Sequence, residues 1–416
     1  MNEELIIKGK LAKDAANSLS LLSAEEKNHA LLQMAEALEQ GVHRILEANK
    51  EDMRNGRENA LSDALMDRLM LTEERIYAMA DGLKALRGIE DPIGKVEEMW
   101  IGAQGIEIGK MRVPMGVIGM IYEARPNVTV DAAGLCLKTG NAVILRGGSD
   151  ALHSNRILTE LIATAAEKAG CPKGSIQSIE QTGREVVTEF IQMTDYLDVI
   201  IPRGGVGLIQ TVVKNATVPV IETGIGNCHI FVDETADLEK AKQIVINAKT
   251  QRPGVCNALE TLLVHKEKAK ALLLELLPLL KAKGVEIRGD HFTREIFEEA
   301  VEVNDSDYAE EFLDLILAVK VVDSIDEAIT HIQRYGTGHS EAIITEHYGN
   351  SRKFLRCVDA AAVYVNASTR FTDGEQFGYG AEIGISTQKL HARGPMGLKE
   401  LTSTKYVIYG DGQIRK

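Results

Sequence analysis

The sequence lacks the cysteine and histidine patterns of a secreted or metal-binding protein. Its five cysteines are irregularly spaced and include no C-x-x-C pair, which excludes a disulfide framework and a structural zinc site. The ten histidines form no H-E-x-x-H motif or other metal-ligand spacing. We therefore expect no metal, and we expect a reducing compartment, the cytoplasm.

Long apolar runs and an excess of positive charge are also missing. The most apolar run, residues 271–280, contains Glu275 and Pro278 and is too short to span a bilayer. The N-terminus has neither the basic nor the apolar region of a secretory signal. The net charge of −14 at pH 7 disfavours nucleic acid and anionic membranes as partners. A soluble protein without a nucleic-acid or membrane partner is expected.

From residue 115 onward, buried apolar strands alternate with amphipathic helices. This order predicts parallel sheets with right-handed crossovers, whose ligands bind at the carboxyl ends of the strands. Before it lie a helical segment over residues 4–90, with turns at Gly41-Val42 and Asn55-Gly56, and a candidate hairpin over about residues 98–113. A final strand over residues 407–409 pairs elsewhere in the chain or on another subunit. The other expected strands cover residues 117–122, 142–145, 175–179, 198–201, 218–221, 259–264, 285–288, 315–322, 342–345 and 362–365.

A short polar turn, TQRPGVCNA over residues 250–258, presents one thiol between an amphipathic helix and a buried strand. Positive charge and backbone N–H groups favour a thiolate, and Arg252 lies four residues before Cys256. A free cysteine there is either a nucleophile or a small core residue. We interpret Cys256 as a catalytic nucleophile and expect the other four cysteines to serve packing.

Three further loops follow expected strands. Residues 146–150 (RGGSD) and 202–207 (PRGGVG) each place an arginine beside glycines, and residues 222–227 (ETGIGN) begin with a carboxylate. Neither glycine loop matches G-x-G-x-x-G or a Walker A motif, so each is either a tight turn or an anion-binding loop. Their repetition at strand ends favours anion or nucleotide binding.

The order of these pieces resembles the aldehyde dehydrogenase superfamily over almost the whole chain. Residues 122–129 (YEARPNVT), 201–205 (IPRGG) and 377–398, which end in QKLHARGPMGL, are similar to its branch that reduces γ-glutamyl phosphate. The resemblance implies an aldehyde-dehydrogenase-like α/β fold with a small β oligomerisation arm. The implied parts are a parallel-sheet cofactor domain (1–225) with the hairpin, an α/β catalytic domain (226–385), and a C-terminal segment (386–416) that returns to the cofactor domain and the oligomerisation edge.

The resemblance also implies an activity. The chain would be an NADP-dependent oxidoreductase of proline biosynthesis that reduces L-glutamyl 5-phosphate to L-glutamate 5-semialdehyde and phosphate through a thioester on Cys256. A homo-oligomer is implied, with glutamate kinase as the upstream partner. Two alternatives stay open: a hydrolytic NAD(P)-dependent aldehyde dehydrogenase for another small semialdehyde, and a non-catalytic nucleotide-binding or assembly protein.

Residue roles follow from the same resemblance. Asn127 and the Cys256 N–H are the candidate oxyanion donors, and Glu222 is a candidate for thiol activation or nicotinamide contact. Ser149 stands where NAD-preferring relatives often carry a glutamate, which favours NADP(H). The substrate is an anion at both ends, and its candidate binders are Arg125, Arg203 and Arg370. The candidate cofactor-binding residues are Arg146, Gly147, Gly148, Ser149, Pro202, Arg203, Gly204, Gly205, Glu311 (for the nicotinamide ribose) and Phe377.

Overall fold

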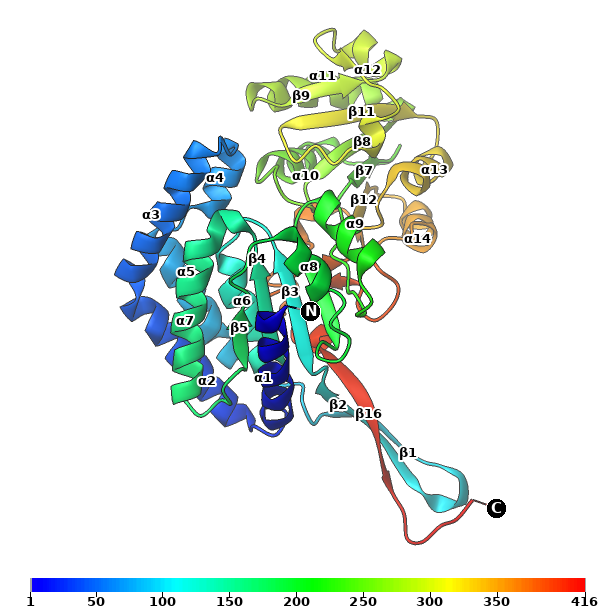
Figure 1. Cartoon of the computed structure of the whole chain (residues 1–416). Helices are drawn as coiled ribbons and strands as arrows, with labels where there is room; N and C mark the ends of the chain where they lie inside the picture. Colours follow the sequence, from blue (N-terminus) through cyan, green and yellow to red (C-terminus); the bar gives the residue numbers. More distant parts are fainter. Residues whose placement is uncertain (1, 416) are drawn as a thin grey trace. The chain divides into compact units, whose positions relative to one another are not determined.

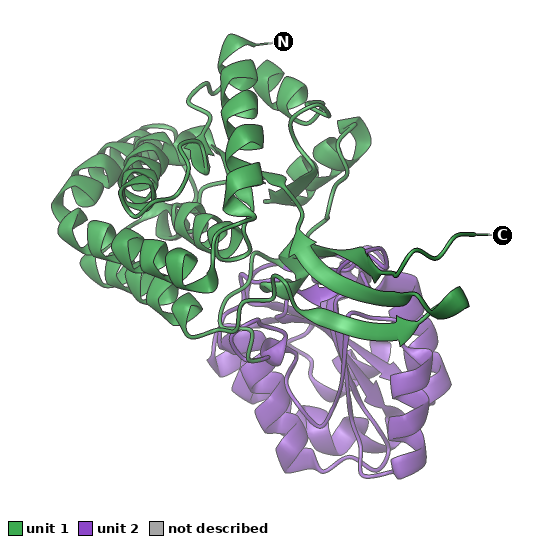
Figure 2. Ribbon diagram, turned by 90° about the horizontal axis from the view of Figure 1, so that it is seen from below, with its two compact units in different colours: residues 1–223, 378–384, 396–416 green, residues 224–377, 385–395 purple. Residues whose placement is uncertain are grey.

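The computed structural model describes residues 2–415, and the chain divides into two compact units (Figure 2). Unit 1 comprises residues 1–223, 378–384 and 396–416, and unit 2 comprises residues 224–377 and 385–395. The sequence assigned residues 378–384 to the second domain. They group with unit 1 instead, where the N–H of Ile383 bonds to the carbonyl of Met396 (3.0 Å) and the N–H of Met396 bonds to the carbonyl of Gly384 (2.9 Å).

Unit 1 begins with a helical segment, as the sequence predicts (Figure 1). Side-chain caps fix several starts, including a capping box between Ser23 and Glu26. The turn expected at Asn55-Gly56 is absent, because Gly56 lies inside α3, where a Cβ would come within 2.8 Å of Met66 Sδ. This glycine therefore serves close packing. The helices are α1 (Glu3–Leu19), α2 (Ala24–Gln40), α3 (Val42–Glu58), α4 (Asp63–Leu69) and α5 (Glu73–Arg87).

The central sheet of unit 1 has four parallel strands in the order β5-β4-β3-β6. The strand expected at residues 218–221 is only an isolated bridge between Ile200 and Val220. Pro219 explains the difference, because proline has no N–H to donate to a ladder. The strands are β3 (Val117–Tyr122), β4 (Ala142–Gly147), β5 (Ile176–Ser178) and β6 (Val199–Arg203), and the helices among them are α6 (Asn127–Lys138), α7 (Leu152–Lys168), α8 (Arg184–Phe190) and α9 (Val206–Asn215).

A second sheet of unit 1 is antiparallel and contains the expected hairpin. Strands β1 (Val96–Ile101) and β2 (Glu107–Pro114) pair with each other, and β16 (Thr402–Tyr409) pairs along the whole of β2. The final strand therefore pairs within its own chain. Every residue of β1 is exposed, and Trp100 packs edge-on against Tyr406 with ring centroids 6.2 Å apart.

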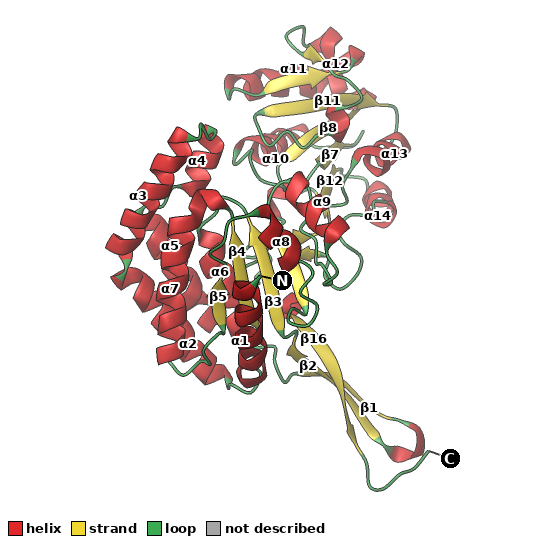
Figure 3. Cartoon of the chain, in the orientation of Figure 1, coloured by secondary structure: helices red, strands yellow, loops and turns green. Residues whose placement is uncertain are grey.

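Unit 2 is built on a parallel sheet of seven strands in the order β10-β9-β11-β8-β7-β12-β13 (Figures 1 and 3). Residues of α10 and α11 pack in one core cluster, and residues of α13 and α14 pack in another. The strands are β7 (Cys228–Val232), β8 (Leu259–His265), β9 (Glu286–Gly289), β10 (Val301–Glu302), β11 (Ile316–Val322), β12 (Ser340–Ile344) and β13 (Ala362–Val365). The helices are α10 (Leu238–Thr250), α11 (Lys266–Ala282), α12 (His291–Ile296), α13 (Ile325–Tyr335) and α14 (Tyr348–Cys357).

Two short strands, β14 (Ile385–Ser386) and β15 (Gly394–Pro395), form a small antiparallel pair in unit 2. Over the described part of the chain, no helix combines the length and apolar character needed to cross a membrane.

Candidate active site

The thiol turn lies at the amino edge of the unit 2 sheet. It covers residues 251–258, between the end of α10 and the start of β8. Because every pair of neighbouring strands in this sheet is parallel, the segment that enters β8 lies at the edge where all its strands begin. The sequence led us to expect ligands at the carboxyl ends of parallel strands, and the thiol is an exception.

The segment that leads into β7 contacts the backbone of Cys256. A Cβ on Gly226 would lie 1.5 Å from the Cys256 carbonyl oxygen, so only glycine fits there. The Cys228 thiol donates to the same oxygen at 3.1 Å. The glycines of the ETGIGN loop leave its backbone open to a close approach, and at Gly226 the approaching group is the backbone of Cys256 itself.

Glu311 lies at the same place. Its Oε1 accepts the N–H of Gly226 at 2.7 Å. Gly226 therefore contacts both the backbone of Cys256 and the carboxylate of Glu311. Two of the residues singled out in the sequence, Cys256 and Glu311, are thus brought together although they are far apart in the chain.

Arg370 joins this group through the residue after the thiol. The Asn257 amide donates to the carbonyl oxygens of Thr372 (2.9 Å) and Arg370 (3.4 Å), and Thr369 Oγ1 donates to the Asn257 carbonyl (2.8 Å). Arg370 Nε in turn donates to Gln251 Oε1 at 2.8 Å. The thiol turn and residues 369–372 are therefore fastened to each other at both ends of the turn.

Among the five cysteines, Cys256 alone is partly accessible without being fully exposed. Cys136, Cys171 and Cys228 are buried, and burial raises the pKa of all three thiols, that of Cys171 to about 11. A high pKa keeps these thiols protonated and unreactive. Cys357 is exposed, so our expectation that it packs in the core is wrong.

The loops after β3, β4 and β6 meet at the carboxyl edge of the unit 1 sheet. A Cβ on Gly148 would lie 3.5 Å from the backbone of Glu123, and Glu123 Oε2 accepts the N–H of Gly205 at 2.8 Å. Gly205 caps the N-terminus of α9. This contact spans β3 and β6, where the strand order reverses and where ligands of such sheets bind. In this structure the anion at the helix N-terminus is the chain's own Glu123.

Arg146 supports its loop from inside the protein. The guanidinium is 7% exposed and donates to the carbonyl oxygens of Gly147 and Thr182, the latter at 2.9 Å. Its Nε is buried and has no hydrogen-bond partner among the described residues. Beside it, Gly147 and Gly148 are half-buried and Ser149 is exposed, so the backbone of this loop is open to a ligand.

The remaining candidates are placed as follows. Asn127 is exposed at the start of α6, and its amide donates to Asp131 Oδ2 at 3.0 Å. Burial raises the pKa of Asp131 to about 6. Glu222, Arg125 and Arg203 are half-buried in unit 1, and Phe377, in unit 2, is 40% exposed.

Several residues that shape the thiol turn were missed in the sequence. They are Cys228, Asn257, and the buried pair Lys249 and Glu260. For the pair a signal existed, because Glu260 interrupts an otherwise apolar strand. For the others no local signal exists, since their partners come from distant parts of the chain.

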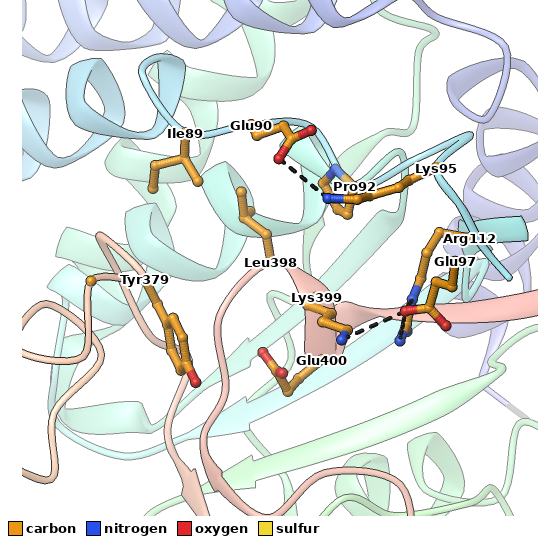
Figure 4. A pocket seen from close by; sticks show the side chains of 11 residues that line it. Ile89, Glu90, Pro92, Lys95, Glu97, Arg112, Tyr379, Leu398, Lys399 and Glu400 are labelled. Carbon is orange, nitrogen blue, oxygen red and sulfur yellow. Dashed lines mark hydrogen bonds and ion pairs between the residues drawn. The ribbon is translucent and has the colours of Figure 1, made fainter.

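Unit 1 also has a cavity of about 390 Å³ beside the base of the antiparallel sheet (Figure 4). Its charged side chains pair with each other: Lys95 Nζ lies 3.4 Å from Glu90 Oε2, and Arg112 Nη2 and Lys399 Nζ lie 2.7 Å and 3.5 Å from Glu97 Oε1. The cavity contains none of the candidate site residues. Among the described residues, no cluster of three or more His, Cys, Asp or Glu side chains could hold a metal ion.

Comparisons with known proteins agree with this architecture. The profile of the aldehyde dehydrogenase family matches residues 4–286. The chain is 63% identical to the gamma-glutamyl phosphate reductase of Heliobacterium modesticaldum and 62% identical to that of Moorella thermoacetica, covering 99% of each chain. The crystal structure of gamma-glutamyl phosphate reductase from Thermotoga maritima matches with a TM-score of 0.97 at 52% identity and full coverage of both chains. The expected α/β fold is confirmed, and the chain belongs to the aldehyde dehydrogenase family and, within it, to the gamma-glutamyl phosphate reductases.

Proposed function

We propose that this chain reduces L-glutamyl 5-phosphate to L-glutamate 5-semialdehyde and phosphate with NADPH, as the second step of proline biosynthesis. Membership of the family implies a nicotinamide cofactor. The observation that carries the proposal is the thiol turn: Cys256 is partly accessible, and its backbone is fixed by Gly226 and Cys228. This arrangement occurs in a chain that matches gamma-glutamyl phosphate reductases over its full length.

The chemistry follows from a fixed thiolate. Cys256 Sγ attacks the acyl carbon of the substrate, the C–O bond to phosphate breaks, and a thioester remains on Cys256. Bound NADPH supplies the hydride that reduces this thioester. The resulting thiohemiacetal on Cys256 then releases the aldehyde and regenerates the thiolate. An oxyanion develops at each tetrahedral stage, and we assign its stabilisation to the Cys256 N–H and to the Asn127 amide.

Water has to be excluded from this thioester, because hydrolysis would waste the activated substrate. Glu222 corresponds to the residue that activates water or the thiol in hydrolytic relatives. We therefore propose that Glu222 contributes less than Cys256, through thiol activation or nicotinamide contact.

We assign the phosphate of the substrate to Arg370, with Arg252 beside it. The reacting carbon bonds to Cys256 Sγ, so the phosphate lies next to the thiol turn, whereas the α-carboxylate lies several bonds away. Arg370 uses Nε for Gln251, and no ion pair within 4.0 Å is found for either guanidinium among the described residues. Burial and the charge of Arg252 lower the pKa of Arg370. Two unneutralised guanidinium groups suit a phosphate dianion. Arg125 and Arg203 are left as candidates for the α-carboxylate.

The cofactor is assigned to the carboxyl edge of unit 1. The half-buried to exposed backbone of residues 147–149 and the exposed backbone of residues 204–205 fit phosphate oxygens. Pro202 and Arg203 lead into the second loop, and Arg146 supplies positive charge next to the first. Ser149 leaves no acid to repel a 2′-phosphate, which favours NADP(H). Glu311 and Phe377 are assigned to the nicotinamide end. Unit 1 is thus proposed as the cofactor domain and unit 2 as the catalytic domain.

We further propose that the antiparallel sheet of unit 1 joins copies of this chain. Its exposed apolar side chains would be covered in a homo-oligomer. These are Val96, Met99, Trp100, Ile101, Tyr406, Ile408 and Tyr409. The proposed setting is the cytoplasm, where glutamate kinase supplies the acyl phosphate.

The function is tested in the reverse direction with glutamate 5-semialdehyde and NADP⁺, with and without phosphate. Wild type should form NADPH only when phosphate is present, and Cys256→Ser should abolish this activity. Cys357→Ser, which removes an exposed thiol outside the turn, should leave it unchanged. NADPH formation that ignores phosphate would indicate a hydrolytic dehydrogenase, and activity that survives in Cys256→Ser would contradict the thioester.

A further inference from the structure

A fully buried ion pair closes the base of the thiol turn. Lys249 in the last turn of α10 and Glu260 in β8 stand on either side of residues 251–258, and their Nζ and Oε2 atoms are 2.7 Å apart. Both side chains are 0% exposed. Buried charges are costly to desolvate, so a gain in folding stability does not by itself explain why this pair is present.

The other oxygen of Glu260 reaches the segment that carries Glu311. Glu260 Oε1 accepts the N–H of Leu313 at 3.2 Å. Leu313 has φ of +53°, a left-handed conformation that is unfavourable for leucine and persists only where the surroundings impose it. Glu260 is the side chain that bonds this residue and so holds the strained turn.

Together with the chain segments between them, these contacts form a closed ring that includes Cys256. From Glu260 the ring runs to Leu313, two residues on from Glu311, and Glu311 binds the N–H of Gly226. Gly226 in turn lies against the Cys256 carbonyl, and the thiol turn leads back to β8 and Glu260. The ring therefore sets the spacing between the thiol and the carboxylate.

The charges around the pair agree with this role. Burial raises the pKa of Glu260 to about 7, and the charge of Glu311 raises it as well, while Lys249 lowers it. Burial lowers the pKa of Lys249, opposed by Glu260, Asp314 and Cys228. Lys249 is thus the cation that opposes the rise in the pKa of Glu260 caused by burial and by the second carboxylate, Glu311.

We propose that Lys249 and Glu260 are positioning residues that fix the distance between Cys256 and Glu311 by holding the Leu313 turn. Neither residue acts on the substrate directly. The inference rests on the proposed function only for its kinetic readout. The competing explanation is an ion pair that contributes to folding alone.

Two double variants separate these explanations. Lys249→Met with Glu260→Gln removes both charges but keeps an oxygen that can accept the Leu313 N–H. Lys249→Met with Glu260→Leu removes the charges and the acceptor. Both avoid leaving one buried charge unpaired, the change that destabilises most strongly. Thermal unfolding, steady-state kinetics with NADP⁺, semialdehyde and phosphate, and the rate of Cys256 alkylation by iodoacetamide are measured for both.

The variant with Lys249→Met and Glu260→Gln (Met/Gln) should keep most of the wild-type activity, and the one with Glu260→Leu is called Met/Leu below. The Met/Leu variant should lose about tenfold or more in kcat/KM, because a misplacement of about 1 Å can cost about 100-fold in rate. It should also show a raised KM for NADP⁺ and an altered alkylation rate at a similar melting temperature. Equal kinetic constants in the two variants, or constants that simply follow the melting temperature, would overturn the proposal.

A second buried pair provides the matched control. Lys27 Nζ and Asp91 Oδ2 in unit 1 lie 2.5 Å apart, with side chains 1% and 10% exposed. Lys27→Met with Asp91→Asn should change the melting temperature but neither kcat/KM nor the alkylation rate. A kinetic loss as large as that of the Lys249→Met, Glu260→Leu variant would show that any buried pair affects activity, and this would contradict the proposal.

Hydrogen exchange of the wild-type protein tests the proposal without any variant. The Leu313 amide lies outside the strands yet should exchange about as slowly as the amides of β8. Exchange at the rate of an open loop would contradict the ring of contacts, even if the Met/Leu variant does not fold. Phosphate-independent activity of the wild type would refute the proposed function but leave this result intact.

Discussion

Unit 1 and unit 2 both contain a parallel sheet flanked by helices, but their candidate functional groups lie at opposite edges. In unit 1 the loops that follow β3, β4 and β6 meet at the carboxyl edge, where Glu123 contacts the start of α9. In unit 2 the segments that precede β7, β8 and β11 meet at the amino edge around Cys256. Parallel topology therefore does not by itself decide which edge is used.

The sheets differ accordingly in what they bury. Strand β3 of unit 1 is apolar along its whole length. In unit 2, by contrast, His229, Glu260 and Glu341 are 0% exposed near the starts of β7, β8 and β12. At the carboxyl edge, helix N-termini supply N–H groups. At the amino edge, close backbone contacts such as that of Gly226 with Cys256, together with buried polar side chains, shape the candidate site. Three predictions test this contrast.

The largest effect is expected from a methyl group at the backbone crossing of unit 2. Gly226→Ala would place a Cβ 1.5 Å from the Cys256 carbonyl oxygen, so the thiol turn must move. We expect kcat/KM to fall about 100-fold or more. The control at the other edge is Gly207→Ala in α9, where a Cβ meets nothing within 4 Å and alanine favours the helix. Near-normal rates in Gly226→Ala would show that the crossing is not rigid.

The next effect is a pH dependence of stability that arises from His331 in unit 2. Burial, with the charges of His229, Lys320 and Arg334, lowers the pKa of His331 from 6.5 to about 3. A histidine with a lowered pKa is stabilising in its neutral form, so this stability is complete above pH 6.5 and is lost as the pH falls toward 3. The steepest slope is about 1.4 kcal/mol per pH unit.

His331→Phe keeps a ring beside Tyr308 and Tyr335 but cannot take up a proton. The difference in unfolding free energy between pH 7 and pH 5 should therefore shrink by about 2 kcal/mol, measured by urea denaturation. His291→Gln, on an exposed histidine, should leave the difference as it is. An unchanged difference in His331→Phe would mean that another group carries the pH dependence.

The smallest effect is expected at the carboxyl edge of unit 1. Glu123→Ala removes the carboxylate that occupies the Gly205 N–H and frees the start of α9 for a phosphate. We expect the Kd for NADPH, measured by calorimetry, to fall about twofold to fivefold. Asp150→Ala in the neighbouring loop controls for loss of one negative charge. Weaker binding in Glu123→Ala would show that this carboxylate itself contacts the ligand.

Much of the fold and part of the site could be predicted from local patterns. Strands β3 and β13 appear at the expected residues, because the hydrophobic period is a local property. The thiol turn was found because a polar, Gly- and Pro-broken segment between two apolar elements is visible in the sequence. Two predictions were wrong, the turn at Gly56 and the strand that contains Pro219, and the reasons differ. Packing against Met66 placed the glycine inside a helix, and a missing N–H reduced the proline segment to a bridge.

The sequence by itself indicated the α/β class, the candidate nucleophile and the glycine loops, because each depends on residues that are neighbours in the chain. Only the tertiary structure decided that Cys256 lies at an amino edge, that Glu311 and Gly226 meet there, and that Glu123 caps α9. The tertiary structure also forms the ion pair between Lys249 and Glu260, on either side of the thiol turn. These contacts link segments separated by up to 85 residues, and their geometry is set by how parallel strands are ordered in a sheet, which no local pattern encodes.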